Sequence, residues 1–499
     1  MRRPAPALVL ALLASVACSS SNPAPGPINV LFIAVDDLND WVGCLGGHPQ
    51  ALTPNIDRLA SRGVLFTNAH CAAPACNPSR AAVFSGRMPQ VTGVWANDRR
   101  QTLGQTFPEA RLLPTVFQEA GYRVAGTGKL LHSGGRDAFD EFFSVGQRWS
   151  PLSPEAVEYT AEELSTKGTG NPTHRTRDSQ GREIILPLNR MPSDRRPDQP
   201  AGESFDWGPF DVPDTDFGDT QITDWAIERI NDTSRKPFFL GVGYYRPHIP
   251  LWAPKRFFDR FTLSPGELPP VKVDDLADLS ETARNWALEP VTAGSHATVV
   301  RHEQWRPAVE AYLASVTYVD HEIGRLLNAL DGSAAAENTL IVLWSDHGWQ
   351  LGEKEHWGKW TGWERSTKVP LVVAPPAMHA DGFAVGSSSD QPVGLIDMYP
   401  TLVELCGVEA PPDLDGRSLV PLLREPGLVT GRVLATMFGP NNASLRTDRW
   451  RYIRYEDGSE ELYDHFSDPN EWDNLAGLQG FADRIQEMRK AVAPYLTEH

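Results

Sequence analysis

Two pairs of side chains that can hold a metal ion each follow an apolar run of the sequence. Asp36 and Asp37 form the first pair, and Asp346 and His347 form the second. Adjacent carboxylates that are partly buried repel each other, and a divalent cation removes this repulsion. Helix capping is the alternative for Asp36 and Asp37 taken alone, but the second pair adds two ligands. Because most of these ligands are oxygen atoms, we expect Ca²⁺, with Mg²⁺ as the alternative, rather than zinc.

A cysteine stands at a predicted helix start in the string 76–80, which reads Cys-Asn-Pro-Ser-Arg. Pro78 suits the first turn of a helix, and the residues up to Phe84 can continue it. The N-terminus of a helix favours anions, and Arg80 adds a positive charge there. These residues leave two interpretations of Cys76 open: a thiolate nucleophile, or a buried structural cysteine, which is the commoner case.

Three more basic side chains follow apolar runs in the same way. Lys129 and His132 come after the run 122–126, and His248 comes after the run 237–243. In an open α/β sheet, ligands bind outside the carboxyl ends of the strands, so these polar groups can meet in one crevice. Taken singly, each has a structural alternative: a surface lysine or a core histidine with satisfied hydrogen bonds.

The elements that would position these residues alternate between strands and helices. Apolar runs at 28–35, 122–126, 237–243 and 340–344 predict buried strands. Helical patterns lie between them, at 55–62, 220–230 and 308–329. This alternation predicts an α/β fold with a large central, mostly parallel sheet sandwiched by helices.

The pattern changes near residue 430. Short alternating strands at 450–455 and 461–464 are joined by a turn that contains Asp457 and Gly458, which indicates a hairpin. A helical pattern at 481–495 follows. We therefore predict a catalytic domain over 28–430 and a smaller antiparallel C-terminal subdomain over 431–499.

Composition excludes several classes of protein. The 499 residues are 41% hydrophobic, which is ample for a large core, and the net charge of −18 argues against nucleic acid as a general partner. No group of cysteines has the spacing of a zinc clip. Residues 167–196, in an insertion at about 149–219, carry seven Lys/Arg against three acids. They predict either a solvated loop, the commoner case, or a basic rim for an anionic substrate.

The N-terminus has the composition of an export signal over 1–18. Arg2 and Arg3 precede an apolar run, and small residues lead to Cys18 in a string that resembles a bacterial lipobox. Ser15 stands where Leu is usual, so cleavage near Ala17 is the alternative. Residues 19–27 have the composition of a linker. These features predict export to the bacterial periplasm or cell envelope, with a lipid anchor at Cys18.

The string 76–80 resembles the signature of type I (formylglycine-dependent) sulfatases, which belong to the alkaline phosphatase superfamily. Phe84, Gly86 and Arg87 continue the match. Other stretches that follow the family order lie at 35–38, 53–59, 128–132, 345–348, 414–419 and 461–464. Within the family, the stretches 243–250 and 346–353 are similar to the iduronate-2-sulfatase branch. The resemblance covers nearly the whole chain after the linker and favours function over the structural alternatives.

The resemblance implies that a formylglycine-generating enzyme oxidises Cys76 to formylglycine, and that its hydrate attacks a sulfate ester. It places the metal ligands on Asp36, Asp37, Asp346, His347 and the modified Cys76, with calcium as the usual ion.

The same resemblance implies roles for the basic residues. Arg80, Lys129 and Lys359 would bind the sulfate, and His248 and Lys359 would protonate the leaving alcohol. His132 would take a proton from the second hydroxyl of the hydrate, so that sulfate leaves by elimination and the aldehyde returns.

We therefore expect a sulfatase that acts on a sulfated glycan, with uronate as the favoured sugar. Two alternatives stay open: a phosphonate monoester or phosphodiester hydrolase of the same superfamily, and a non-catalytic glycan-binding lipoprotein. The second is disfavoured because binding alone requires neither Cys76 nor His132.

Overall fold

The computed structural model describes residues 27–145, 147–152, 174–191, 205–232, 237–290 and 294–496. The predicted export signal, Cys18 and most of the linker lie outside these ranges, as do parts of the predicted insertion. In the described ranges, no helix combines the length and the apolar character that crossing a bilayer requires.

The core of the protein is an eight-stranded sheet with the order β15-β2-β14-β11-β1-β9-β4-β5. β14 runs antiparallel to its neighbours, and the other pairs in the sheet are parallel. The predicted large, mostly parallel sheet is therefore confirmed. The strands are β1 Asn29–Val35, β2 Val64–Phe66, β4 Arg123–Gly128, β5 Glu141–Phe143, β9 Phe238–Tyr244, β11 Thr339–Ser345, β14 Leu371–Ala374 and β15 Ser387–Ser389.

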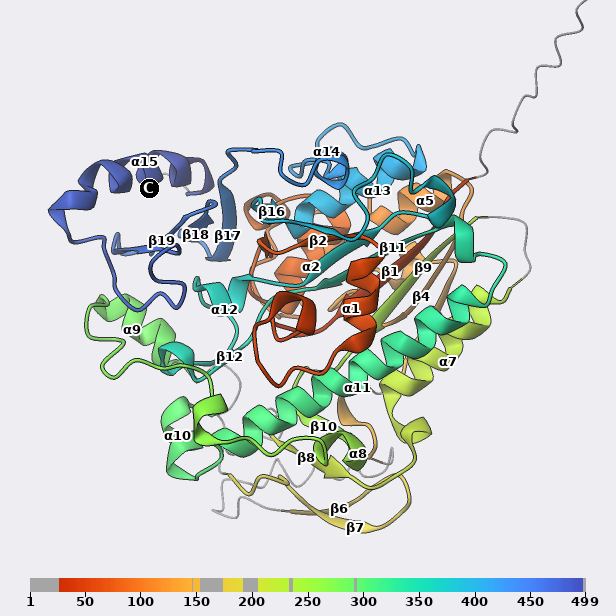
Figure 1. Cartoon of the computed structure of the whole chain (residues 1–499), viewed down its shortest axis with the longest axis horizontal. Coiled ribbons are helices and arrows are strands. Elements are labelled where there is room, and N and C mark those ends of the chain that lie inside the picture. The colour runs from red at the N-terminus through yellow and green to blue at the C-terminus, as the bar shows by residue number, and fades with distance from the viewer. Residues whose placement is uncertain are drawn as a thin grey trace, which may run out of the picture.

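The central strand β1 is buried from Val30 onward because helices cover both faces of the sheet. Its side chains alternate between two cores: Leu31 and Ile33 belong to one, Phe32 and Ala34 to the other. The first core packs against α1 Pro54–Ser61, α7 Gly218–Ile230 and α11 Trp305–Asp331, as Figure 1 shows. The second packs against α2 Cys76–Ser85, α5 Leu113–Glu119, α13 Met398–Cys406 and α14 Val420–Arg424.

The register of the parallel strands aligns their carboxyl ends. Val35 of β1 pairs with Ser345 of β11 and with Tyr244 of β9, and Gly128 of β4 pairs with Gly243 of β9. The approach of β4 to β9 requires glycine, because a Cβ atom on Gly128 would lie 2.0 Å from the Gly243 carbonyl oxygen. The residues that follow these strands are therefore brought to one edge of the sheet.

Shorter elements surround this framework. In the region of the predicted insertion, β6 His174–Arg177 pairs with β7 Glu183–Leu186, and β8 Trp207–Phe210 pairs with β10 Leu251–Pro254. The remaining elements are β3 Ala69–His70, β12 Gln350–Leu351, β13 Trp357–Gly358, β16 Val393–Gly394, α3 Pro89–Thr92, α4 Leu103–Thr106, α8 Lys255–Phe258, α9 Glu281–Leu288, α10 His296–Arg301 and α12 Glu364–Thr367.

The C-terminal part forms a separate antiparallel sheet, seen at the upper left of Figure 1. Its strands are β17 Leu434–Gly439, β18 Asn442–Arg446, β19 Trp450–Arg454 and β20 Glu460–Asp464, and α15 Ala482–Val492 packs on the sheet. The predicted hairpin and the predicted final helix are both present. The domain boundary near residue 430 stays a prediction.

A buried ion-pair network connects this sheet to α12. Arg451 is fully buried, and its guanidinium donates to Glu471 Oε1 at 3.0 Å and pairs with Glu364 of α12. Burial would raise the pKa of Glu471, but the charge of Arg451 outweighs it and holds this pKa below its usual range. His465 also contacts Glu471, at 2.9 Å. The arginine therefore neutralises carboxylates from two parts of the fold.

We expect Arg451→Met to lower the free energy of unfolding by about 3–5 kcal/mol, because it removes the buried cation that Glu364 and Glu471 share. Urea denaturation followed by circular dichroism measures this change. The control is Arg449→Met, since the ion pair of Arg449 with Asp464 is partly exposed and a change of at most about 1 kcal/mol is expected. Equal losses in the two variants would contradict the role of Arg451.

Candidate active site

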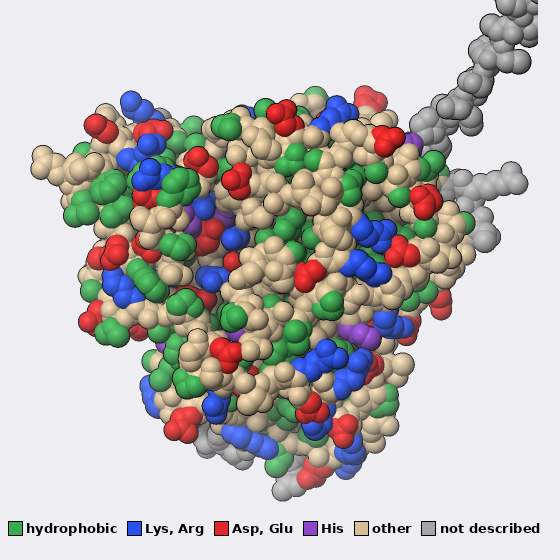
Figure 2. Space-filling view, in the orientation of Figure 1, with side chains coloured by type: hydrophobic (Ala, Val, Ile, Leu, Met, Phe, Trp, Pro, Cys, Tyr) green, Lys and Arg blue, Asp and Glu red, His purple; other side chains and the backbone are tan. Residues whose placement is uncertain are grey.

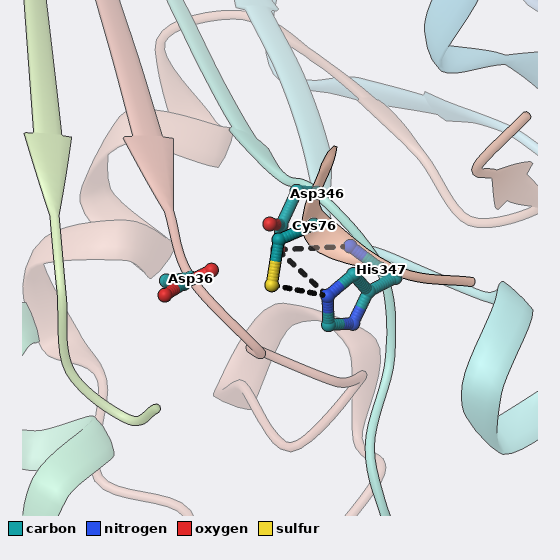
Figure 3. A group of neighbouring side chains, drawn as sticks. All are labelled: Asp36, Cys76, Asp346 and His347. Atoms are coloured by element: carbon teal, nitrogen blue, oxygen red, sulfur yellow. Dashed lines mark hydrogen bonds and ion pairs between the residues drawn. The ribbon is translucent and has the colours of Figure 1, made fainter. Parts of the chain in front are cut away.

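Cys76 is the first residue of α2, at the carboxyl edge of the sheet. Every residue of α2 is buried, and the side chain of Cys76 is 0% exposed to bulk solvent. The next backbone N–H, of Asn77, donates to Asn97 Oδ1 at 2.8 Å, which anchors the start of the helix. In Figure 3, Asp36 lies on one side of the Cys76 sulfur and His347 on the other.

Three cationic groups surround the Cys76 sulfur. The Nζ of Lys359 lies 2.8 Å from Sγ, the Nζ of Lys129 3.5 Å, and the Nε2 of His347 3.4 Å. Burial alone would raise the pKa of the Cys76 thiol, but Lys129, Lys359 and His347 outweigh it and hold this pKa well below its usual range. The site therefore stabilises negative charge at the position of the Cys76 side-chain atom.

Arg80 links the two carboxylate-bearing strand ends. It lies one helical turn after Cys76 and is fully buried. Its Nε donates to Asp346 Oδ2 at 2.8 Å, and its NH2 donates to Asp36 Oδ1 at 3.2 Å. Burial would raise the pKa of Asp346, but Arg80 and then His347 keep it well below the usual value. The guanidinium therefore favours the charged form of Asp346, whereas burial still raises the pKa of Asp36 although Lys129 opposes it.

Asp36 and Asp37 both face the site, although consecutive side chains of a strand normally point to opposite faces. The backbone of Asp37 has φ of 60°, in the left-handed region that Asp adopts more readily than most residues. As a result, Asp36 pairs with Lys129, while Asp37 Oδ1 accepts from Lys359 Nζ at 2.8 Å. A single backbone conformation at the strand end thus delivers two carboxylates.

The donor atoms at this edge fit a divalent cation. Ligand atoms of Asp36, Cys76, Asp346 and His347 all lie within 4.8 Å of one another, as do those of Asp36, Asp37, Cys76 and His248. Asp37 Oδ2 is buried and has no hydrogen-bond partner among the described residues. Burial raises the pKa of Asp37 to about 7 even though Lys359 opposes it. The side chains present leave this carboxylate short of positive charge, which a cation would supply.

His347 is oriented as a ligand. Its Nδ1 donates to the Gly348 carbonyl at 2.9 Å, which directs Nε2 toward Asp37 Oδ1 at 3.3 Å and toward Cys76. Burial lowers the pKa of His347, but Asp346 reverses this effect and the pKa rises to about 9. A metal ion bound at Nε2 would replace the proton that these neighbours hold there.

Two further histidines lie at the site and differ in their hydrogen bonds. The Nδ1 of His248 donates to the Ile249 carbonyl at 2.5 Å, so in the neutral ring Nε2 is an acceptor. Burial first, and then Lys129, lower the pKa of His248 to about 3. His132 interacts with the Cys76 side chain, while its Nδ1 is buried and unpartnered within the described ranges.

A cavity of about 810 Å³ opens onto this group. Lys129, His132, His248 and Lys359 line it. Aromatic rings also line it: Tyr245, whose ring centroid lies 4.8 Å from Lys129 Nζ, and Trp349, whose centroid lies 5.6 Å from Lys359 Nζ. Both lysines are therefore steered toward the cavity by cation–π contacts.

The structure brings together every residue that the sequence proposed for the site: Asp36, Asp37, Cys76, Arg80, Lys129, His132, His248, Asp346, His347 and Lys359. Their individual catalytic and metal-binding roles stay predictions.

Sequence reasoning missed Asn97, whose Nδ2 lies 3.8 Å from Cys76 Sγ. Asn97 stands in a loop with no motif, so no sequence signal could have identified it. Described arginines of the cavity wall are Arg99, Arg136 and Arg148. The basic residues of the stretch 167–196 whose side chains are described do not line this cavity; they are Arg177, Arg182 and Arg190. Lys167, Arg195 and Arg196 lie outside the described residues.

Comparison with known proteins identifies related sequences. The family model described as "Sulfatase" matches residues 28–408, and the model "N-sulphoglucosamine sulphohydrolase, C-terminal" matches residues 352–497. A sulfatase of Formosa agariphila is 37% identical over 93% of this chain and 86% of its own length. Iduronate 2-sulfatase of Homo sapiens is 31% identical over 79% of this chain and 72% of its own length.

Solved structures share the fold at lower sequence identity. One protein was solved in complex with its substrate D-glucosamine-2-N,6-O-disulfate. Its sequence is 21% identical to this chain, the match covers 94% of this chain and 97% of that protein's chain, and the TM-score is 0.68. The phosphonate monoester hydrolase of Agrobacterium radiobacter is 22% identical, covers 93% of this chain and 95% of its own, and has a TM-score of 0.73. At these identities the likeness shows the fold alone.

We expect Asp37→Asn to weaken Ca²⁺ binding by more than about tenfold, because it removes the charge of the carboxylate whose buried Oδ2 has no hydrogen-bond partner among the described residues. Isothermal titration calorimetry of chelator-treated protein measures the affinity, and a parallel Mg²⁺ titration identifies the preferred ion. Asp40→Asn is the matched control, since Asp40 pairs with Arg365 and Lys368 and its loss should leave the affinity unchanged. Equal Ca²⁺ affinities of wild type and Asp37→Asn would exclude the assignment.

Proposed function

Since this chain belongs to the sulfatase family, we propose that it hydrolyses sulfate esters of a uronate-containing glycan with a nucleophile derived from Cys76. The main support for this proposal is the environment of the Cys76 side chain. Cys76 begins a fully buried helix, and Lys129, Lys359 and His347 surround its sulfur. A structural cysteine in a core would need none of these charges.

We propose that Cys76 is converted to formylglycine by a formylglycine-generating enzyme, and that Ca²⁺ is the resident ion. When present, the hydrated aldehyde would supply an oxygen nucleophile, and the ion would screen the charge of the sulfate oxygens. The proposed ion ligands are Asp36, Asp37, Asp346 and His347, together with the modified residue 76.

The fixed cations of the site bind and orient the sulfate. Lys129 and Lys359 place their Nζ atoms within 3.5 Å of the Cys76 side-chain atom, so a sulfate approaching that atom meets both ammonium groups. Arg80 is held by Asp36 and Asp346 and keeps the start of α2 in register with the two strand ends. Charges held this rigidly stabilise developing negative charge without further reorganisation.

The two proton transfers of the proposed reaction are assigned to different side chains. Lys359 is cationic and faces the cavity, whereas the neutral His248 ring presents an acceptor at Nε2. We therefore assign protonation of the leaving alcohol to Lys359, and a positioning role to His248. His132 contacts residue 76 and carries an unpartnered buried Nδ1, which suits it to accept a proton there.

The substrate class rests on relatives and on the cavity. The relatives include two mammalian iduronate 2-sulfatases, each 31% identical to this chain. The aromatic rings of Tyr245, Trp286 and Trp349 in the cavity wall offer apolar faces of the kind on which sugar rings stack.

We expect Cys76→Ala to abolish hydrolysis of sulfate esters while leaving the fold intact, because the nucleophile is lost but no ion pair of the core depends on the thiol alone. Hydrolysis of 4-nitrophenyl sulfate and far-ultraviolet circular dichroism report the two effects. Cys406→Ala, which removes a free thiol that does not line the cavity, is the control and should stay active.

The same preparations assayed on a phosphonate monoester and a phosphodiester separate the competing reaction classes. Dominant activity on the phosphorus esters would replace the sulfatase proposal, and full sulfatase activity of Cys76→Ala would refute the mechanism. Mass analysis of the peptide that carries residue 76 shows whether the wild-type cysteine is modified.

We expect Lys359→Gln to lower kcat on a sugar sulfate at least about tenfold more than on 4-nitrophenyl sulfate. A sugar alcohol needs protonation as it leaves, whereas 4-nitrophenolate is stable without it. His248→Gln should lower kcat on both substrates by similar factors. Steady-state kinetics on both substrates test this assignment, and the reverse pattern would give the acid role to His248.

A further inference from the structure

Three arginines in the wall of the active-site cavity form no ion pair with a carboxylate among the described residues. Arg99, Arg136 and Arg148 all line the cavity, and none of them forms an ion pair within the part of the chain that the structure describes. Most other charged side chains near the site, such as Arg80 and Lys129, are neutralised by acids. The three arginines therefore leave the cavity with surplus positive charge.

Two of the three arginines come from segments that also carry a residue at the site. Arg99 lies two residues after Asn97, which contacts Cys76. Arg136 lies four residues after His132. The three chain segments therefore place cations around the same opening as the proposed nucleophile.

Arg148 is the most constrained of the three. Its backbone carbonyl accepts from the NH2 of Arg246 at 3.3 Å, and Arg246 NH1 reaches the carbonyl of His248 at 3.5 Å. The guanidinium of Arg246 thus connects the segment that carries Arg148 to the segment that carries His248. The guanidinium of Arg148 lies over the ring of Trp149 at 5.1 Å, and its Nε is buried without a hydrogen-bond partner in the described ranges.

A buried guanidinium nitrogen without an acceptor is costly, which points to an acceptor that arrives with a ligand. Burial lowers the pKa of Arg246, and the neighbouring charge of Arg148 lowers it further, while Asp219 opposes both. An anion bound at Arg148 would relieve this repulsion as well as satisfy Nε.

The described carboxylates of the cavity wall do not supply the missing hydrogen-bond acceptor for Arg148 Nε. Among the described residues, Asp98 and Glu289 are the carboxylates that line the cavity. Asp98 already accepts three hydrogen bonds from the side chain of Arg100 and one from its backbone N–H. Figure 2 shows that acidic and basic side chains are interspersed over the face that it draws, as expected of an ordinary charged surface. The unpaired arginines of the cavity depart from that pattern.

We propose that Arg148, assisted by Arg136 and Arg99, forms a second anion subsite that binds a carboxylate or sulfate group of the substrate other than the sulfate being hydrolysed. This inference rests on the proposed function, because it assigns the subsite to the same bound glycan. A carboxylate and a sulfate group each present two negatively charged oxygens that a guanidinium can bind with two parallel hydrogen bonds. The subsite makes the enzyme selective for sugars with at least two acidic groups.

Four substrates test the proposal: 4-nitrophenyl sulfate, a 2-O-sulfated uronate disaccharide, its carboxyl-reduced counterpart and a disulfated glucosamine. We expect Arg148→Met to lower kcat/KM on substrates with a second anion at least about tenfold more than on 4-nitrophenyl sulfate, mainly through KM. Arg148→Lys should restore part of the loss, because it keeps the charge but not the fork of donors. Arg301→Met removes an exposed arginine outside the cavity and should change none of these ratios.

The pattern across substrates identifies the anion. If Arg148→Met lowers kcat/KM only on the unreduced uronate disaccharide, the subsite binds a carboxylate. If it lowers kcat/KM only on the disulfated glucosamine, the subsite binds a sulfate. A loss of the same factor on all four substrates, or no loss on any, overturns the proposal.

Binding measurements separate the subsite from the reaction. The affinity of Cys76→Ala protein for the uronate disaccharide and for the disulfated glucosamine is measured by calorimetry, with and without Arg148→Met. At least about tenfold weaker binding of one of them in the double variant supports the subsite even if the wild type hydrolyses phosphorus esters rather than sulfates. Unchanged affinity for both sugars overturns it even if the wild type is an efficient sulfatase.

Discussion

The whole site depends on burying many charges at one edge of a sheet without leaving any of them unpaired. Asp36 and Asp346 are fully buried next to Arg80, and Lys129 and Lys359 are almost fully buried beside Asp36 and Asp37. A single carboxylate in such a place would take up a proton rather than stay charged. The interlocking pairs hold the pKa of Asp346 below its usual value, but burial still raises the pKa of Asp36 and of Asp37. The buried Asp37 Oδ2, which has no hydrogen-bond partner among the described residues, marks where a cation would complete the balance.

Much of this arrangement could be predicted because it follows from simple periodicities. Parallel strands that are covered on both faces have continuous apolar sequences, so β1, β9 and β11 could be predicted as buried strands. The long helix α11 could be predicted from the period of its apolar residues. The ends of parallel strands must share one edge. Polar residues such as Asp36 and Asp346 could therefore be grouped before any contact was known.

What could not be predicted depends on loops and on contacts between distant segments. Asn97 and Arg148 reach the site from segments without periodicity or motif, and their positions are set by partners such as Asn77 and Arg246. The basic stretch 167–196 was conspicuous in composition, yet the described arginines of the cavity wall come from elsewhere. Charge density along the chain is a weak guide to charge density in space. Arg451 illustrates the same limit, since its partners Glu364 and Glu471 are separated by 107 positions.

The direction of β1 has a consequence for orientation in the cell. The strand begins at Asn29 on one edge of the sheet and ends beside Asp36 at the opposite edge, where the site residues lie. If Cys18 carries a lipid, the short spacer between it and β1 would tie the edge of the sheet that bears Asn29 to the membrane. The opposite edge of the sheet, with the site residues, would then face away from the membrane surface.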